Sequence, residues 1–152
     1  MKKVFIACDH GGFVLKELCK TQIQELGFEV IDLGTDDETR SVDYNDFADK
    51  LTQKLTECGR AQTLCATPEA FGVLICGSGI GMSMAANRVG GIRAALCHDV
   101  TTAWLARKHN NANVLCLGGR IVSQAVASDI VQAFFTQDFE GGRHERRVSK
   151  LG

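Results

Sequence analysis

Residues 71–81 read Phe-Gly-Val-Leu-Ile-Cys-Gly-Ser-Gly-Ile-Gly, an apolar run that ends in three alternating glycines. A short apolar run closed by glycine predicts a buried strand, and the spacing that follows predicts a helix through about Arg88. The same unit of strand and helix recurs along the chain. The other predicted strands are 3–8, 28–33, 92–97 and 112–117, and the other predicted helices are 13–26, 47–58, 100–108 and 123–135.

Strands that alternate with helices are typical of a parallel sheet covered by helices on both faces. We therefore predict a single Rossmann-like three-layer α/β/α domain over residues 1–152, with a five-stranded parallel sheet and a C-terminal helix at 141–150. Residues 60–70, which hold the only proline, predict a surface loop. Ligands of such sheets bind beyond the carboxyl ends of the strands, so the residues that follow each strand are the candidates for function.

Composition excludes several classes of protein. The chain has 152 residues, 45% of them hydrophobic, and a formal net charge of -1, so it has no overall field that attracts nucleic acid or an anionic membrane. No apolar run is long enough to span a bilayer. The seven cysteines are odd in number and form no C-x-x-C pair, which argues against a disulfide framework and a zinc site. These features favour a cytoplasmic protein.

The glycines at 77, 79 and 81 have two readings. The dinucleotide-binding fingerprint is G-x-G-x-x-G after the first strand, whereas this G-x-G-x-G follows the third, so we predict no nicotinamide cofactor. The glycines still let a ligand approach the backbone closely, and the free N–H groups at the start of the next helix can donate to an anion. A tight turn with no ligand is the alternative.

Cys76 is the last residue of the third predicted strand, directly before that turn. A thiolate in this position can act as a base or as a nucleophile. Ser78 can orient a substrate hydroxyl, and the free amides of residues 77–81 can stabilise a developing enediolate.

The C-terminal tail is basic. Arg143 and Arg147 are four residues apart and share one face of a helix, an arrangement that suits a phosphate. The alternative is a solvated basic helix that pairs with Glu145.

Four blocks of sequence together carry a resemblance. They are Cys8-Asp9-His10-Gly11, Ile75-Cys76-Gly77-Ser78-Gly79-Ile80-Gly81, His109-Asn110-x-x-Asn113-Val114-Leu115 and Gly141-Gly142-Arg143-His144-x-x-Arg147-Val148. In this order, over about residues 3 to 148, the chain resembles the ribose-5-phosphate isomerase B family, to which galactose-6-phosphate isomerase subunits are close relatives.

The resemblance implies an enzyme that interconverts ribose 5-phosphate and ribulose 5-phosphate through an enediol, in the non-oxidative pentose phosphate pathway, without metal or cofactor. It implies that Cys76 moves the proton between C2 and C1. It implies that Ser78 and the amides of residues 77–81 bind the enediolate. It also implies that His109 opens the furanose ring and that Asp9 lies near the sugar hydroxyls.

It also implies the substrate-binding residues, which are His10, Tyr44, Gly77, Gly79, Ile80, Gly81, Asn110, Arg120, Arg143, His144 and Arg147. Asn110 would bind the reacting oxygens and Tyr44 would line the pocket. The phosphate would lie between His10, Arg120, Arg143 and Arg147, beside His144. The family forms homodimers or dimers of dimers with sites at the subunit interface, and the segment 109–120 would come from the partner chain.

This chain departs from the family at two places. Asn45 replaces the proline that commonly follows the tyrosine, which predicts a less rigid loop around Tyr44. Asn111 replaces an aspartate, which removes a carboxylate that would support the loop carrying His109.

Three other functions remain possible from the sequence. The substrate can be a six-carbon aldose phosphate, such as galactose 6-phosphate or allose 6-phosphate. The chain can be a regulatory module that binds a phosphate or a nucleotide, although this reading does not use Cys76 or His109. A cysteine hydrolase would pair Cys76 with His109 but would leave the two arginines of the tail without a purpose.

Overall fold

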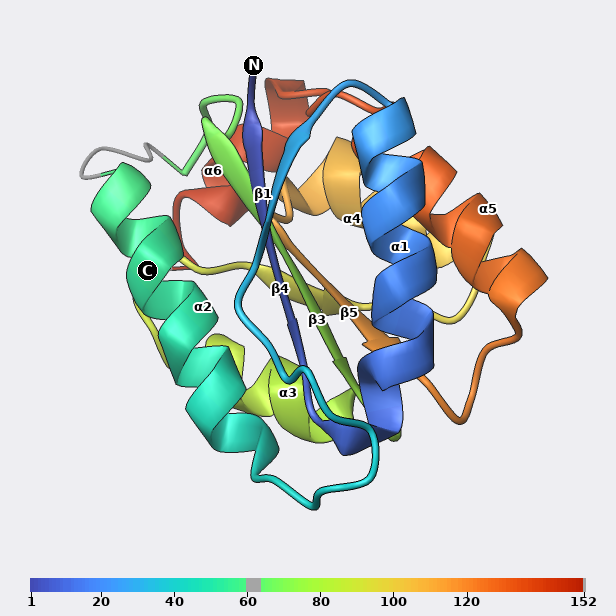
Figure 1. Ribbon diagram of the computed structural model, residues 1–152. Coiled ribbons are helices and arrows are strands. Elements are labelled where there is room, and N and C mark those ends of the chain that lie inside the picture. The colour runs from blue at the N-terminus through green and yellow to red at the C-terminus, as the bar shows by residue number, and fades with distance from the viewer. Residues whose placement is uncertain (60–63, 152) are drawn as a thin grey trace.

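The computed structural model describes residues 1–59 and 64–151. Its centre is a parallel five-stranded sheet in the order β2-β1-β3-β5-β4 (Figure 1). The strands are β1 (Lys3–Cys8), β2 (Glu29–Asp32), β3 (Ala70–Cys76), β4 (Ala94–Leu96) and β5 (Val114–Gly118). The central strands β1, β3 and β5 are buried almost throughout, and this explains why they are continuous apolar runs in the sequence.

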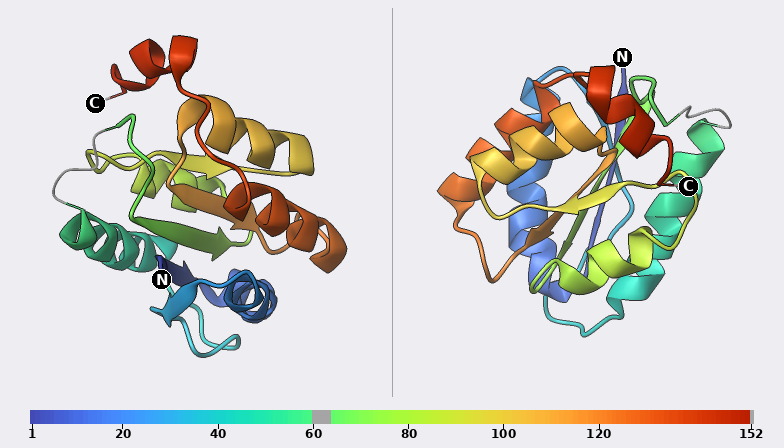
Figure 2. Two further views of the ribbon diagram at one scale, coloured as in Figure 1. Left: turned by 90° about the horizontal axis from the view of Figure 1, so that it is seen from above. Right: turned by 180° about the vertical axis from the view of Figure 1, so that it is seen from behind.

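Helices cover both faces of the sheet, and the two views of Figure 2 show the layers. The helices α1 (Phe13–Glu25), α4 (Val100–Asn110) and α5 (Gln124–Phe135) pack together on one face, while α2 (Tyr44–Cys58) and α3 (Ile80–Ala86) pack on the other. Neighbouring strand residues belong to opposite cores: Ile6 and Val73 lie in one, Phe5 and Leu74 in the other. This period of two is the pleat of the strand. The predicted three-layer α/β/α fold is confirmed.

The order of the strands creates a crevice. β1 pairs with β2 on one side and with β3 on the other, so the chain reverses direction across the sheet between β2 and β3. The connections after β1 and β3 therefore leave toward α1 and α3 on opposite faces of the sheet, and open α/β sheets bind ligands at such a switch point. In Figure 1 the carboxyl edge of the sheet lies beside α3, and the opposite edge lies beside α6 (Glu145–Val148).

Several element boundaries differ from the prediction. Helix α2 begins at Tyr44, three residues before the expected start, so Tyr44 belongs to a helical turn and not to a loop. The predicted C-terminal helix is present, but it is shorter than the expected 141–150. A 3-10 turn (Gly142–His144) precedes the short α6, and Gly141 and Gly142 both have positive φ angles, 67° and 56°. Such angles cannot be part of a right-handed helix.

The predicted loop at 60–70 is described only from Leu64 onward, because residues 60–63 lie outside the described part of the chain. None of the helices in the described ranges has the length and hydrophobicity of a membrane span.

Candidate active site

Three turns meet at the carboxyl edge of the sheet, one after each of the central strands. A Cβ atom on Gly11 would lie 3.2 Å from the Cα atom of Gly77, so these two backbones touch. The Gly119 amide donates to the carbonyl of Cys76 over 2.8 Å. Only glycine allows this approach of backbone to backbone. The close packing brings the residues that follow β1, β3 and β5 into one site.

Cys76 ends β3 inside this site and is 4% exposed. Gly79, with a φ of 77°, turns the chain back so that its amide donates to the Cys76 sulfur over 3.1 Å. The next amide, that of Ile80, donates to the hydroxyl of Ser78 over 3.2 Å. An N–H aimed at the sulfur stabilises a thiolate. Two of the amides expected to be free for an enediolate therefore already have side-chain acceptors within the turn.

Four other buried cysteines are less suited to proton transfer. Burial raises the pKa of Cys8 to about 11 and the pKa of Cys97 to about 12. Burial also raises the pKa of Cys19 to about 12, and that of Cys116 still further. These thiols stay protonated at neutral pH, so they pack as small apolar side chains.

Asp9 and His10 follow β1 at the same edge. The Asp9 carboxylate is nearly buried and accepts the amide of Gly11 over 2.9 Å, which fixes its orientation. The amide of Val42 donates to Nδ1 of His10 over 3.3 Å. A neutral His10 must therefore carry its proton on Nε2, which leaves a donor for a ligand.

Tyr44 and Arg120 complete this group. A Cβ atom on Gly81 would lie 2.6 Å from Cζ of Tyr44, so the tyrosine ring lies against the first turn of α3. The Arg120 guanidinium lies against Gly77, because a Cβ atom there would be 3.2 Å from its Nη1. We call the whole group the thiol cluster; its members are Asp9, His10, Tyr44, Cys76, Gly77, Ser78, Gly79, Ile80, Gly81 and Arg120.

The remaining predicted residues form a second group. His109 lies in the last turn of α4, and its ring stacks on the ring of His144 with centroids 4.1 Å apart and planes at 15°. The Nε2 atom of His109 is 3.7 Å from the Glu140 carboxylate. The edge of Trp104 approaches the same ring at 6.2 Å. We call this group the histidine cluster; its members are His109, Asn110, Glu140, Arg143, His144 and Arg147.

His144 is the buried member of the histidine cluster, with 8% of its surface exposed. Burial is the main cause that lowers its pKa, and the neighbouring His109 and Arg143 lower it further. His144 is therefore neutral at pH 7. Arg143 and Arg147 flank it from two elements: Arg143 lies in the 3-10 turn and Arg147 in α6, which follows that turn directly.

The two clusters lie at opposite edges of the sheet. The thiol cluster follows the carboxyl end of β3, whereas the end of α4 lies beside the start of β3, where the Gly72 amide donates to the carbonyl of Asn113. With a rise of about 3.3 Å per residue, the seven residues of β3 separate the clusters by roughly 20 Å. Arg120 belongs to the thiol cluster of the same chain as Cys76. The expectation that the segment 109–120 comes from the partner chain does not fit Arg120, because β5 carries this residue away from His109 and to Gly77 of its own chain.

Asn111 supports the end of α4 in a way that the sequence did not predict. It has a left-handed φ of 47°, and its side-chain amide donates to the carbonyls of Leu64 and Ala66 over 2.9 and 2.7 Å. Its side-chain oxygen accepts from the buried Arg107 over 3.0 Å. An aspartate could not make the two donations. Leu64 and Ala66, in the described part of the predicted loop at 60–70, are therefore held against the end of α4, next to the histidine cluster.

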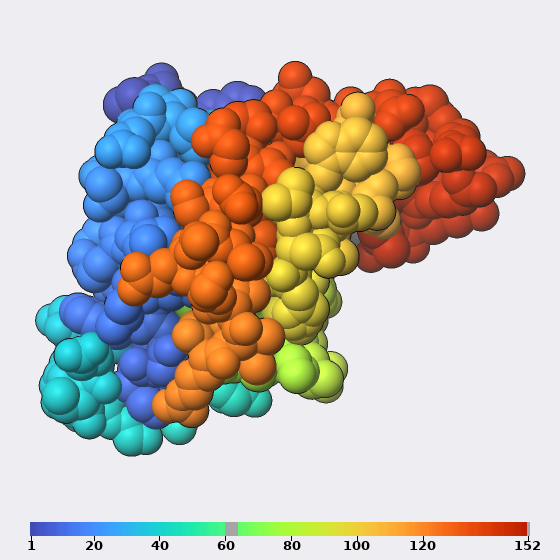
Figure 3. Space-filling view, turned by 90° about the vertical axis from the view of Figure 1, so that its right-hand side faces the viewer, coloured from blue at the N-terminus to red at the C-terminus, as the bar shows by residue number. Residues whose placement is uncertain are grey.

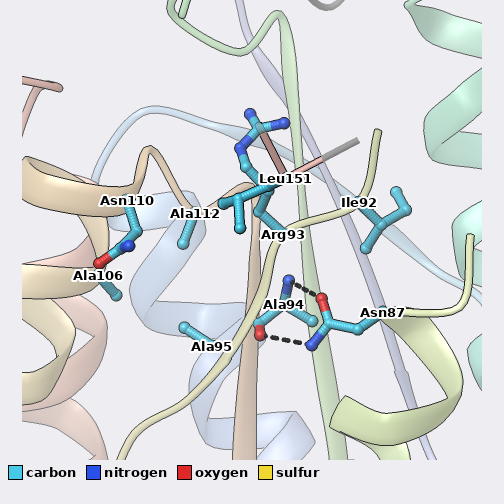
Figure 4. A pocket seen from close by; sticks show the side chains of 9 residues that line it. All are labelled: Asn87, Ile92, Arg93, Ala94, Ala95, Ala106, Asn110, Ala112 and Leu151. Atoms are coloured by element: carbon cyan, nitrogen blue, oxygen red, sulfur yellow. Dashed lines mark hydrogen bonds between the residues drawn. The ribbon is translucent and has the colours of Figure 1, made fainter. Parts of the chain in front are cut away.

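A pocket of about 400 Å³ lies beside the edge strand β4, and Asn110 is one of the residues that line it (Figure 4). The Asn87 side chain closes part of the strand edge, because it both accepts from the Ala94 amide and donates to the Ala94 carbonyl, each over 2.8–2.9 Å. Arg93 and Leu151 also line the pocket. Asn110 faces this pocket and not the thiol cluster of its own chain.

The histidine cluster also contains the donor atoms of a possible metal site, since atoms of His109, Glu140 and His144 all lie within 4.8 Å of one another. A metal ion must lie close to the plane of each imidazole that binds it. The two rings are stacked with their planes at 15°, so the planes meet only far beyond the length of a metal–nitrogen bond. The geometry therefore favours packing of the rings over chelation.

Sequence reasoning missed Glu140. It is an acidic residue directly before the basic block Gly141-Gly142-Arg143-His144, and this change of charge is the sequence signal by which it could have been found. Only the fold shows that it faces His109, because residue 140 returns to α4 after the whole of β5 and α5.

The fold and the thiol cluster define a parallel α/β enzyme with a cysteine at the ligand-binding edge of its sheet. The Ribose/Galactose Isomerase family model matches residues 4–151. The chain is 40% identical over 151 residues to ribose-5-phosphate isomerase B of Escherichia coli, covering 99% of this chain and 95% of that protein. The chain belongs to the ribose/galactose isomerase family.

Solved structures agree with this assignment. A ribose 5-phosphate isomerase of Thermotoga maritima is 48% identical, with a TM-score of 0.87 over 99% of this chain and 97% of that one. Ribose-5-phosphate isomerase B of Mycoplasma genitalium, solved with bound ribulose 5-phosphate, is 42% identical, with a TM-score of 0.88 over 98% and 93%.

Proposed function

We propose that this protein interconverts ribose 5-phosphate and ribulose 5-phosphate through an enediolate, with Cys76 as the base and without a metal or cofactor. The observation that carries the proposal is the hydrogen bond from the Gly79 amide to the Cys76 sulfur at the carboxyl edge of the sheet. The bound ribulose 5-phosphate of the Mycoplasma genitalium relative supports the choice of a five-carbon substrate.

The proton transfer needs one base and one site for negative charge. The Cys76 thiolate takes the proton from C2, and the electron pair of the C–H bond forms the C1–C2 double bond of the enediolate while charge moves to the carbonyl oxygen. The hydroxyl proton on O2 then passes to O1, and the electron pair left on O2 forms the C2=O2 double bond. The electron pair of the C1–C2 double bond takes the proton back from the thiol at C1, which gives the ketose and restores the thiolate. Ser78 binds the developing oxyanion together with the turn amides at residues 77–81 other than those of Gly79 and Ile80, which already donate within the turn. Donors aimed at that charge lower the barrier.

The residues around the thiol hold the substrate. Asp9, oriented by the Gly11 amide, binds sugar hydroxyls, and Tyr44 closes the pocket from α2. The Nε2–H group of His10 and the guanidinium of Arg120 bind the phosphate. Fixing both ends of the sugar holds C1 and C2 in reacting geometry.

The histidine cluster completes the site from a second chain. His109 opens the ring, Asn110 binds the reacting oxygens, and Arg143 with Arg147 binds the phosphate beside His144. Within one chain these residues lie roughly 20 Å from Cys76, too far to touch the same sugar phosphate. We therefore propose a homodimer, or a dimer of dimers, in which the histidine cluster of each chain meets the thiol cluster of the other.

The face around β4 fits such a partner. Exposed apolar side chains flank this edge strand: Met84 on α3, Val100 and Trp104 on α4, and Leu151 after α6. Figure 3 shows the molecule hollowed between α6 and α3, with α6 projecting beyond α4. Exposed apolar groups and an unpaired strand edge are typical of surfaces that a partner covers.

We further propose that the protein works in the cytoplasm, in the non-oxidative pentose phosphate pathway. All seven cysteines are unpaired in the structure, which suits a reducing compartment.

The test is turnover of purified protein with five- and six-carbon aldose phosphates in the presence of a chelator. The proposal expects ketose formation from ribose 5-phosphate that the chelator does not reduce. Faster turnover of allose 6-phosphate or galactose 6-phosphate would move the proposal to a six-carbon substrate. Thermal stabilisation by nucleotides, with no turnover of any sugar phosphate, would favour the regulatory module.

A further inference from the structure

We infer that Glu140 is a positioning residue for His109: its carboxylate, with the stacked ring of His144, holds the His109 imidazole for the opening of the sugar ring. The inference rests on the proposed function, in which His109 performs that step. It adds a residue to the machinery that neither the motifs nor the family comparison assigned.

The backbone of Glu140 is tied to the helix that carries His109. Its amide donates to the carbonyl of Lys108 over 3.0 Å, one residue before His109. This bond joins the tail to the last turn of α4 and brings the Glu140 carboxylate to 3.7 Å from Nε2 of His109. The distance is that of an ion pair when the imidazole is protonated.

His144 restrains the same ring in another direction. The stack at 4.1 Å and 15° sets the plane of the His109 ring, while the carboxylate sets its rotation within that plane. The Nε2 atom of His144 is buried without a hydrogen-bond partner among the described residues, so this nitrogen makes no polar contact and the ring meets His109 through its face. Burial, with the neighbouring His109 and Arg143, lowers the pKa of His144 and disfavours charge on that ring, whereas the His109 ring faces the Glu140 carboxylate.

Ring opening makes this restraint useful. The proton of the O1 hydroxyl passes to the imidazole, and the electron pair of the O–H bond forms the C1=O1 double bond. The C1–O4 bond breaks with its electron pair on O4, which takes the proton from the imidazole. The proton count is unchanged, but the imidazole passes through its charged form. With Nε2 turned toward Glu140, Nδ1 is left for the sugar, and a facing carboxylate stabilises the imidazolium.

The experiment separates ring opening from proton transfer. Ribose 5-phosphate is mainly a closed ring and must be opened, whereas ribulose 5-phosphate is an open chain. Conversion of ribose 5-phosphate therefore needs His109, but exchange of the C1 proton of ribulose 5-phosphate with D2O, followed by NMR, needs only the base. The matched variants are Glu140→Gln and Glu145→Gln, two exposed glutamates of the same tail.

We expect Glu140→Gln to lower kcat for ribose 5-phosphate by about 10–100-fold, as loss of a carboxylate behind a working histidine does, while the exchange keeps the wild-type rate. Glu140→Asp should recover part of the loss. His109→Asn should show the same selective loss more strongly, and Glu145→Gln should change neither reaction. Because the Glu140 side chain is half exposed, the variant is expected to fold, which its melting temperature checks.

Several outcomes would contradict the proposed role of Glu140. Equal loss of both reactions in Glu140→Gln would mean a general structural role and would overturn the inference, as would wild-type rates for both. If the wild-type protein itself neither converts nor exchanges these sugars, the proposed function fails first. If His109→Asn converts ribose 5-phosphate normally, the role of His109 fails and the inference fails with it.

Discussion

The amide nitrogen of Gly79 lies 3.1 Å from the sulfur of Cys76 and donates its hydrogen to it. The contact exists because Gly79 adopts a left-handed conformation, with a φ of 77°, that folds the turn back over the end of β3. A Cβ atom there would lie 2.6 Å from the Leu96 side chain and 2.8 Å from the backbone of Leu117. The glycine at position 79 therefore places a hydrogen-bond donor against the Cys76 sulfur, in addition to leaving room for a ligand.

Replacement of Cys76 by alanine should remove catalysis and keep binding. Loss of the base is expected to lower kcat by about 10³-fold or more, since proton transfer by a positioned group contributes on that scale. Stabilisation of the variant by ribose 5-phosphate in a thermal-shift experiment should persist. The control is Cys116→Ala, which removes a buried thiol from the adjacent strand β5. Normal turnover by Cys76→Ala would rule out this cysteine as the base.

Alanine at position 81 should damage the pocket without damaging the fold. Its Cβ atom would occupy the place of the Tyr44 ring, which is partly exposed and free to swing away. Alanine in a helix otherwise stabilises by about 0.5–1 kcal/mol relative to glycine. We expect a folded protein whose kcat/KM falls by about tenfold or more, because small displacements of positioning groups are costly.

Gly90→Ala is the matched control for that experiment, since a Cβ atom there has no neighbour within 4 Å in the described structure. The double variant Tyr44→Ala with Gly81→Ala should lose little more activity than Tyr44→Ala alone. Full activity of Gly81→Ala would show that Tyr44 does not line the site.

Mixing two inactive variants should restore activity if the sites are shared between chains. Cys76→Ala damages the thiol cluster and His109→Asn damages the histidine cluster, so a hybrid dimer has one intact site. Random pairing after mild unfolding and refolding would recover about a quarter of the wild-type activity. No recovery, in a mixture that size-exclusion chromatography shows to be dimeric, would place both clusters of each site in one chain.

Asn111→Asp should destabilise the protein even though it restores the residue common in the family. The aspartate gains an ionic contact with Arg107, but it cannot donate to the carbonyls of Leu64 and Ala66. Leaving two carbonyls without donors and facing a carboxylate is expected to cost about 1–3 kcal/mol in the free energy of unfolding, measured in urea. Asn45→Asp, at an exposed site, should change it by less than about 0.5 kcal/mol. A more stable Asn111→Asp would show that the ion pair outweighs the lost donations.

The ion pairs of Asp32 should give the stability a dependence on acid pH. Burial on its own would raise the pKa of this carboxyl, but hydrogen bonds from Lys20, the Gly34 amide and the buried Lys16 outweigh it and hold the pKa below its ordinary 3.8. A lowered folded pKa means that the stabilisation is complete above about pH 4 and is lost as the pH falls through the folded value.

Asp32→Asn should therefore be less stable than the wild type by about 1–3 kcal/mol at neutral pH, because the buried ammonium of Lys16 loses its nearer ionic partner and keeps only Glu17, at 3.6 Å. The difference should shrink as the pH falls below about 4. Glu57→Gln, which breaks the exposed pair with Lys54, is the control and should cost about 0.5 kcal/mol or less at any pH. A constant difference between wild type and Asp32→Asn across this range would contradict the assignment.

Much of this molecule follows from local pattern. The apolar run that ends at Cys76 and the glycines after it predicted a buried strand and a turn, and both are confirmed. Burial on both faces forces such a strand to be apolar at every position, so the pattern is hard to miss. The helix that begins at Tyr44 was placed three residues too late, because its first turn is polar and shows no apolar period.

The parallel α/β fold and the residue types that the chemistry needs can be predicted from the amino-acid sequence. Strand and helix periods and glycine turns are local properties of the chain, so they are visible without the structure. The tertiary structure alone decided where those residues lie relative to one another. β5 carries His109 and Arg120 to opposite edges of the sheet, and the return of the tail after α5 sets Glu140 against His109. Contacts between residues far apart along the chain depend on the order of the strands, which no local pattern records.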